Sequence, residues 1–147
     1  MTSITTRRVN FARVLGDATI SGSEAVAILE IAYAMANANG HASFEELESF
    51  RALAKHLAPN RPVGEILEAF GEAFEAQSIE DRVRDAAKRI PSEGARDAAY
   101  KAAYAIAVFD LETNEDERAL DELLIDVLQL GSRVDALEQQ VNEALIE

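Results

Sequence analysis

Two stretches of the chain share one pattern in constant register. Residues 32–46 read AYAMANANGHASFEE, and residues 102–117 read AAYAIAVFDLETNEDE. In each stretch a small apolar run containing a Tyr leads to a polar break and then to an acidic helix start, and Asn39 and Asp110 stand at equivalent positions. A repeated helical unit of this kind needs its partner to bury its apolar face. The constant register therefore predicts two similar halves packed about two central apolar helices.

The apolar residues beyond the break repeat in the same register, so the repeat spans about 24–76 and 95–147. The matching pairs are Leu53 and Leu124, Leu57 and Leu128, Val63 and Val134, Ile66 and Leu137, and Phe74 and Leu145. Turn signals separate segments of helical length, and no segment shows the sustained alternation of a β-strand. We therefore expect an all-α fold of seven to eight helices, forming one domain over residues 1–147.

Polar residues mark where several of these helices should begin. Ser43 followed by Glu46 is a capping-box pattern, which predicts a helix over about residues 44–57. Asn114 is the repeat equivalent of Ser43 and predicts a matching start in the second half. Near the C-terminal end, Ser132 is expected to cap the last helix.

Charge and composition limit the classes of partner. The chain carries 27 Asp and Glu against 14 Lys and Arg, a net charge of −13. This charge disfavours nucleic acids and anionic membrane surfaces, and it favours cations and basic protein partners. The lack of Cys excludes disulfides, thiolate zinc sites and cysteine catalysis. No apolar run reaches the roughly 18 residues of a membrane span, so we expect no membrane insertion and a soluble, unprocessed, cytoplasmic protein.

The second polar break is unusually acidic and is a candidate cation site. Hard divalent cations prefer several oxygen ligands, which a loop between helices can bring together. Helix capping combined with a solvated acidic face explains the same residues without a metal. An EF-hand is rejected because Glu115 stands where that loop needs Gly, and Asp121 replaces the bidentate Glu. The acidic and amide side chains concerned are Asp110, Glu112, Asn114, Asp116, Glu117 and Asp121.

The two breaks resemble the motif of the TerB-like tellurite-resistance family, which is related to the N-terminal domain of the DjlA co-chaperones. That motif has an Asp-Gly pair and a Glu seven residues after the Asp. Residues 38–46 keep the Gly and the Glu but carry Asn39 in place of the Asp, whereas residues 109–117 keep Asp110 and Glu117 but carry Leu111 in place of the Gly. The resemblance covers roughly residues 24–145. It implies a non-catalytic helical module linked to tellurite or other stress responses, with acidic residues that bind a divalent metal ion.

The resemblance implies a set of metal ligands in this chain. Asp110 and Glu117 are the expected ligands for calcium or magnesium, with Glu112, Asp116 and Asp121 as helpers. In the first break, Asn39 and Glu46 form a weaker candidate pair, because Asn39 has only a carbonyl oxygen where the motif has a carboxylate.

A second hypothesis needs no metal. Residues 110–147 contain 12 acids and 2 bases, so this acidic C-terminal face could recruit a basic protein partner. Enzymatic function has no positive support, because the chain lacks phosphate-binding and nucleophile-elbow motifs and shows no paired carboxylates in an obviously apolar pocket. His41 and His56 are expected to be structural or surface residues, and Tyr33 and Tyr104 to belong to the core. An enzyme or small-molecule carrier with a cleft between the halves stays open as a third class.

Overall fold

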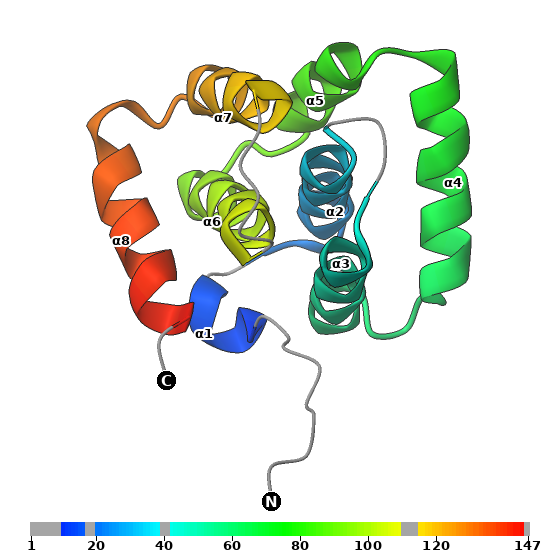
Figure 1. Cartoon of the computed structure of the whole chain (residues 1–147), viewed down its shortest axis with the longest axis horizontal. Helices are drawn as coiled ribbons and strands as arrows, with labels where there is room; N and C mark the ends of the chain where they lie inside the picture. Colours follow the sequence, from blue (N-terminus) through cyan, green and yellow to red (C-terminus); the bar gives the residue numbers. More distant parts are fainter. Residues whose placement is uncertain (1–9, 17–19, 39–41, 110–114, 146–147) are drawn as a thin grey trace, which may run out of the picture.

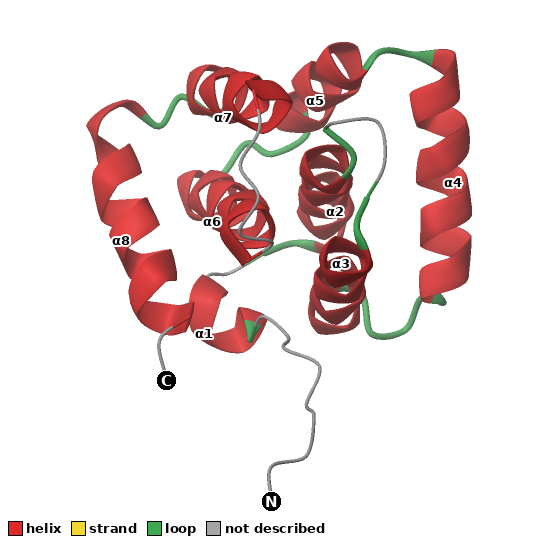
Figure 2. Ribbon diagram, in the orientation of Figure 1, coloured by secondary structure: helices red, strands yellow, loops and turns green. Residues whose placement is uncertain are grey.

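The computed structural model describes residues 10–16, 20–38, 42–109 and 115–145. Over these ranges the chain forms eight α-helices and one short 3₁₀ turn, without any strand (Figure 2). The expected all-α class and helix number are thus confirmed. The helices are α1 (Phe11–Leu15), α2 (Gly22–Ala36), α3 (Phe44–Leu57), α4 (Val63–Ala76), α5 (Ile79–Lys88), α6 (Glu93–Phe109), α7 (Glu115–Val127) and α8 (Val134–Leu145), and the 3₁₀ turn is Gly131–Arg133.

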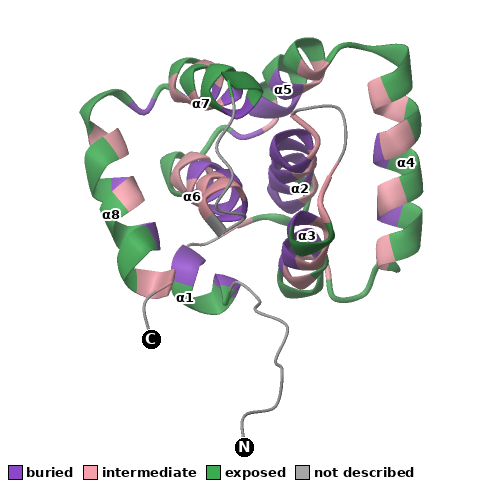
Figure 3. Cartoon of the chain, viewed as in Figure 1, coloured by how far each residue is buried: buried purple, intermediate pink, exposed green. Residues whose placement is uncertain are grey.

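Helices α2 and α6 lie side by side at the centre of the molecule, and the other helices surround them (Figure 1). Both are rich in Ala, whose small side chain lets the two helix backbones approach closely. Ala27, Ala32, Ala98 and Ala102 are fully buried, and Figure 3 shows burial concentrated on this central pair. Helices α4 and α8 stand at opposite sides of the molecule as outer helices (Figure 1).

Side-chain caps explain several helix starts. Ser43 accepts from the backbone N–H of Glu46, and Glu46 accepts from the N–H of Ser43, so the predicted capping box of α3 is confirmed. Ser21 and Glu24 form the same arrangement at the start of α2. Each box satisfies backbone donors that the first turn of a helix leaves without partners.

The starts of the helices repeat in the register seen in the sequence. Helices α2, α3 and α4 begin at residues 22, 44 and 63, and helices α6, α7 and α8 begin at residues 93, 115 and 134. The difference in residue number is the same for all three pairs, and it equals the difference between Asn39 and Asp110. The two sets of helices also share an order, with one central helix, one flanking helix and one outer helix in each (Figure 1).

The expected cap at Ser132 was wrong. Ser132 lies inside the 3₁₀ turn Gly131–Arg133, and this turn runs directly into α8. An N-cap residue needs an extended backbone, whereas the backbone here is already helical at Leu130 and at Val134. Positive φ values end α7 and begin the turn, with a φ of 56° at Gln129 and of 58° at Gly131.

Candidate functional site

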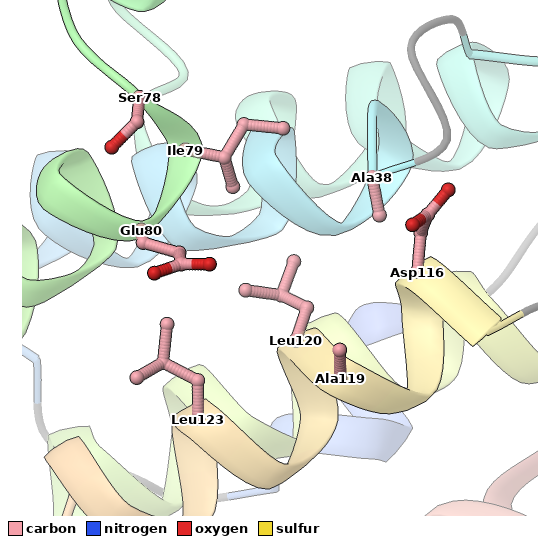
Figure 4. A pocket seen from close by; sticks show the side chains of 8 residues that line it. All are labelled: Ala38, Ser78, Ile79, Glu80, Asp116, Ala119, Leu120 and Leu123. Carbon is pink, nitrogen blue, oxygen red and sulfur yellow. The ribbon is translucent and has the colours of Figure 1, made fainter.

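A groove of about 430 Å³ lies between α5 and α7, and Ala38, which follows α2, also lines it. Figure 4 shows Leu120 and Ile79 between the carboxylates of Glu80 and Asp116, with Leu123 further along α7 beneath Glu80. The groove thus has an apolar floor and an acidic group toward each end. Its lining residues are Ala38, Ser78, Ile79, Glu80, Asp116, Ala119, Leu120 and Leu123.

Helical periodicity places the α7 side of the groove. Asp116, Leu120 and Leu123 follow one another at helical i, i+4 and i, i+3 spacing, so they lie along one face of α7. Leu120 is buried, whereas Leu123 is half-buried and Asp116 is exposed. This face of α7 therefore combines buried apolar side chains with one solvent-exposed carboxylate.

The opposite wall comes from the first turn of α5. The Ser78 hydroxyl accepts from the backbone N–H of Asp81 at 3.1 Å and so fixes where the helix begins. Ile79 then packs against the core while the next residue, Glu80, is exposed. Ser78 itself is the one neutral polar side chain among the described lining residues.

The charge around the groove is negative. Among the described residues that line it there are two acids and no Lys or Arg. Helix α7 adds to this, because it carries six acids against the single base Arg118. A site of this kind can bind a molecule that is apolar along its length and positively charged at its ends.

The structure separates several of the residues that sequence analysis grouped as metal ligands. Asp116 faces the α5–α7 groove, whereas Asp121 lies beside the Tyr100 hydroxyl of α6. Glu117 is buried in the first turn of α7, with 4% of its surface exposed. Among the residues that the structure describes, no group of three or more acidic or His side chains is placed to hold a metal ion. Asp110, Glu112, Asn114 and Asn39 lie outside the described residues, as does His41.

Glu46 has a structural role that the sequence also predicted. It is 4% exposed, and its Oε1 accepts from the backbone N–H of Ser43 at 2.9 Å. Glu46 and Glu117 are repeat equivalents, and each is the third residue of its helix. The two carboxylates therefore occupy matching places at the starts of α3 and α7.

A polar cluster that sequence analysis did not find lies between α6, α7 and α8. Tyr100 is fully buried, and its hydroxyl donates to Glu138 Oε2 at 2.6 Å. The carboxyl group of Asp121 lies beside the same hydroxyl. Burial raises the pKa of Asp121, and the charges of Glu138 and Glu122 raise it further against the opposing Tyr100 hydrogen bond. Asp121 and Glu138 are both half-buried, and the cluster is not visible in the sequence because its members come from three helices.

A second missed cluster joins α2 to α5. Glu30 is 1% exposed and pairs with both Arg82 and Arg89 of α5. The Arg82 Nε donates to Glu30 Oε2 at 2.6 Å. A signal was present, since Glu30 is the one charge between Ala25 and Ala38, and such a charge is buried only with partners.

Tyr33 and Tyr104 pack against the core as expected, and His56 lies at the surface. Tyr33 packs among Phe50, Phe70 and Phe74, with ring centroids 5.8, 5.5 and 5.0 Å away. Tyr104 stacks on Tyr100 at 6.0 Å. His56 is exposed in the last turn of α3.

Two wider findings bear on the class of protein. Within the described residues, no helix is long and apolar enough to cross a membrane. Comparisons with protein-family models, with curated proteins and with solved structures give no match to this chain. Function is therefore inferred from the geometry and charge of the chain's own sites.

Proposed function

We propose that this chain is a non-enzymatic helical module that binds a basic amphipathic helix of another protein in the α5–α7 groove. The observation that carries this proposal is the composition of the groove, in which apolar side chains lie between two carboxylates and no described lining residue is basic. This proposal develops the metal-free alternative of the sequence analysis, in which the acidic C-terminal face over residues 110–147 recruits a basic partner; the acidic α7 side of the groove belongs to that face and supports it.

An amphipathic helix matches the groove in both shape and charge. Helix-in-groove binding anchors apolar side chains at i, i+3 and i, i+4 spacing, which is also the spacing of the groove-lining side chains along α7. Lys or Arg residues flanking those anchors would reach Glu80 and Asp116. The net charge of −13 would also attract a basic partner over longer distances and speed its association at low salt.

The test uses a synthetic Lys/Leu amphipathic peptide of about 18 residues, long enough to form a helix when bound. Its binding to the full chain is followed by fluorescence anisotropy and by backbone amide shifts. We expect binding that weakens as salt rises, with the largest shifts in residues 78–80 and 116–123. The double variant Glu80→Gln/Asp116→Asn should weaken binding by roughly three- to tenfold, since two rim charges are lost.

Two controls separate the groove from general acidity. Glu68→Gln/Glu72→Gln removes the same charge from exposed positions of the outer helix α4, and we expect it to leave affinity nearly unchanged. A Glu/Leu peptide of the same pattern should not bind. Equal weakening by both double variants, or shifts spread over the whole surface, would show that the groove is not the binding site.

A second candidate function is the one that the TerB-like resemblance implies, with two like halves and a divalent cation held near residues 110–117 in a stress or tellurite-resistance setting. Its support is architectural. The helix starts repeat in constant register, and the buried carboxylates of Glu46 and Glu117 occupy matching positions. Binding of a basic helix and binding of a cation are compatible functions. Residues 110–117 include the start of α7, and other residues of α7 line the groove.

A further inference from the structure

A cavity of about 340 Å³ lies between the central helix α2 and the first turns of the outer helix α4, and we call it the α2–α4 cavity. Among the side chains at its wall, Leu29, Ile66 and Phe70 are buried, whereas Ala69 is exposed. It shares no lining residue with the α5–α7 groove and is a separate feature of the molecule. Its lining residues are Val26, Leu29, Arg61, Pro62, Glu65, Ile66, Ala69 and Phe70.

The apolar walls of the cavity come from one face of each helix. Val26 and Leu29 are three residues apart on α2, and Ile66 is followed at helical spacing by Ala69 and Phe70 on α4. Residues at these spacings lie on the same side of a helix, so two apolar faces enclose the space. Small-molecule sites commonly have apolar walls with few polar groups and volumes of about 300–1,000 Å³. The cavity fits this description at the small end of the range.

The second half of the chain bridges the equivalent place with an ion pair. The repeat equivalents of Val26 and Pro62 are Asp97 and Arg133. Arg133 Nη2 lies 2.8 Å from Asp97 Oδ1, so a charged pair joins the central helix α6 to the turn before the outer helix α8. Val26 and Pro62 are apolar and cannot form such a bridge. The place that an ion pair crosses in the second half is therefore an apolar cavity in the first half.

Two charged side chains, Arg61 and Glu65, stand at the edge of the cavity. Both are exposed, and neither forms an ion pair with another residue that the structure describes. The N-cap of α4 between them is Pro62, whose ring fixes its backbone φ. The Arg61 backbone N–H donates to the Ala58 carbonyl at 3.1 Å and closes the preceding turn. The backbone that carries Arg61 is therefore held in place beside the cavity.

The surroundings of this edge are positive, although the chain as a whole is negative. Residues 49–64 contain three bases and no acid, and two of these bases, Arg51 and Lys55, lie beside the first turn of α4. The positive end of the α4 dipole also lies here, where it stabilises Glu65 and opposes Arg61. An added negative charge beside Arg61 is therefore favoured over an added positive charge beside Glu65. Because screening limits the reach of charges to about 10 Å at 0.1 M salt, these near charges outweigh the distant acids.

We propose that the α2–α4 cavity binds a small amphipathic carboxylate, with its apolar chain against Leu29, Ile66 and Phe70 and its carboxylate on the guanidinium of Arg61. Arg holds a carboxylate through two parallel N–H···O bonds. A phosphate monoester carries nearly two negative charges, which Glu65 at the same edge repels, so a singly charged head group fits better. This binding does not depend on the proposed binding of a basic helix in the α5–α7 groove.

The test is a titration of the full chain with octanoate at about 0.1 M salt, followed by backbone amide shifts. We expect saturable binding in the millimolar range or tighter, with the largest shifts in residues 26–29 and 61–70. Ala69→Leu places a larger side chain in the cavity and should weaken binding by roughly tenfold or more. Arg61→Gln should weaken binding about two- to fivefold, because it removes one exposed ion pair.

Each variant has a matched control that leaves the cavity intact. Ala76→Leu makes the same change at an exposed position about two turns further along α4, and Arg84→Gln removes an exposed base of α5. Both should leave the affinity for octanoate nearly unchanged. Octylamine, which has the same chain and the opposite charge, should bind the cavity more weakly than octanoate. Acetate, which lacks the chain, should cause no saturable shifts there.

Several results would overturn the proposal. One is octanoate shifts that are absent from the cavity or confined to residues 78–80 and 116–123 of the α5–α7 groove. Another is equal weakening by Ala69→Leu and Ala76→Leu, which would show that the cavity does not hold the chain. Equal affinities of Arg61→Gln and Arg84→Gln, or of octanoate and octylamine for the cavity, would remove Arg61 as the carboxylate partner.

Discussion

The carboxylate of Glu24 in α2 accepts two hydrogen bonds from Ser92, the residue that precedes α6. The Ser92 backbone N–H lies 3.1 Å from Glu24 Oε2 and the Ser92 hydroxyl lies 2.8 Å from it. Glu24 also completes the capping box of its own helix with Ser21. Burial alone would raise the pKa of Glu24, but the hydrogen bonds from Ser92 and Ser21 outweigh it and lower that pKa. One side chain thus aligns the starts of both central helices.

The shared cap predicts a large effect for Glu24→Ala. The substitution removes the acceptor for Ser92 and the reciprocal half of the capping box, so we expect a loss of about 2 kcal/mol in unfolding free energy. Urea denaturation measures it. Ser21→Ala is the matched comparison, because it removes a cap of α2 alone and should cost about 1 kcal/mol. Equal losses for the two variants would mean that the contact with Ser92 adds nothing.

The ion pairs of Glu30 predict a second stability effect. Glu30→Gln leaves Arg82 and Arg89 without their buried carboxylate, and we expect a loss of about 2–3 kcal/mol, since both Arg side chains keep some access to water. Arg84→Gln on the exposed face of α5 should change stability by less than about 0.5 kcal/mol. Thermal denaturation of both variants tests this, and a neutral Glu30→Gln would count against a structural role for the ion pairs.

Asp121 predicts a pH dependence of definite sign. Its pKa is raised in the folded protein, so the folded state holds the proton more tightly than the unfolded chain, where Asp titrates near 4. The stability from this proton is present in full below about pH 4 and is lost as pH rises through the folded-state pKa. The charged groups that raise this pKa are Glu138 of α8 and Glu122 of the same helix.

Urea denaturation between about pH 4 and pH 7 checks this sign. We expect the unfolding free energy of the wild type, relative to Asp121→Asn, to fall as pH rises across the window. Glu138→Gln removes one of the charges that raise the Asp121 pKa. It should therefore narrow the pH range over which this relative unfolding free energy falls. An unfolding free energy, relative to Asp121→Asn, that rises with pH would contradict a raised pKa of Asp121 in the folded protein.

The cation hypothesis for residues 110–117 predicts stabilisation by ligand. Calcium that binds only the folded state raises unfolding free energy by about 2.7 kcal/mol when its free concentration is 100 times its dissociation constant. Millimolar calcium or magnesium should then raise the melting temperature beyond a matched salt control, and Asp110→Asn/Glu117→Gln should lose that response. An identical response of wild type and variant would remove the second break as a metal site.

Local sequence signals were sufficient to predict the bounds of a helix whose start is fixed by its own capping residues. The helix predicted over 44–57 is observed as Phe44–Leu57, because Ser43 and Glu46 supply a complete cap within a single helical turn. The last helix was placed less well, since its start depends on the turn at Gln129 and Gly131 rather than on a capping side chain.

The candidate sites were predictable only in part. The acidity of α7 is visible in the sequence, but the groove needs α5 beside α7, and that pairing follows from helix packing. The same holds for Tyr100, which meets Asp121 and Glu138 only because three helices converge. The three residues belong to three different helices and stand far apart in the sequence. Helical periodicity relates only residues three or four positions apart, so no sequence pattern reveals this cluster.

The sequence by itself determined the all-α class, the capped start of α3, and the constant register between matching helices, because helical periodicity and capping act over short stretches of chain. Only the tertiary structure decided that Glu30 meets two Arg side chains, and that Asp116 faces a groove while Asp121 faces Tyr100. These contacts depend on which helix faces pack together. That packing is decided by residues far apart in the chain, whose apolar side chains must be buried and whose buried charges must be paired.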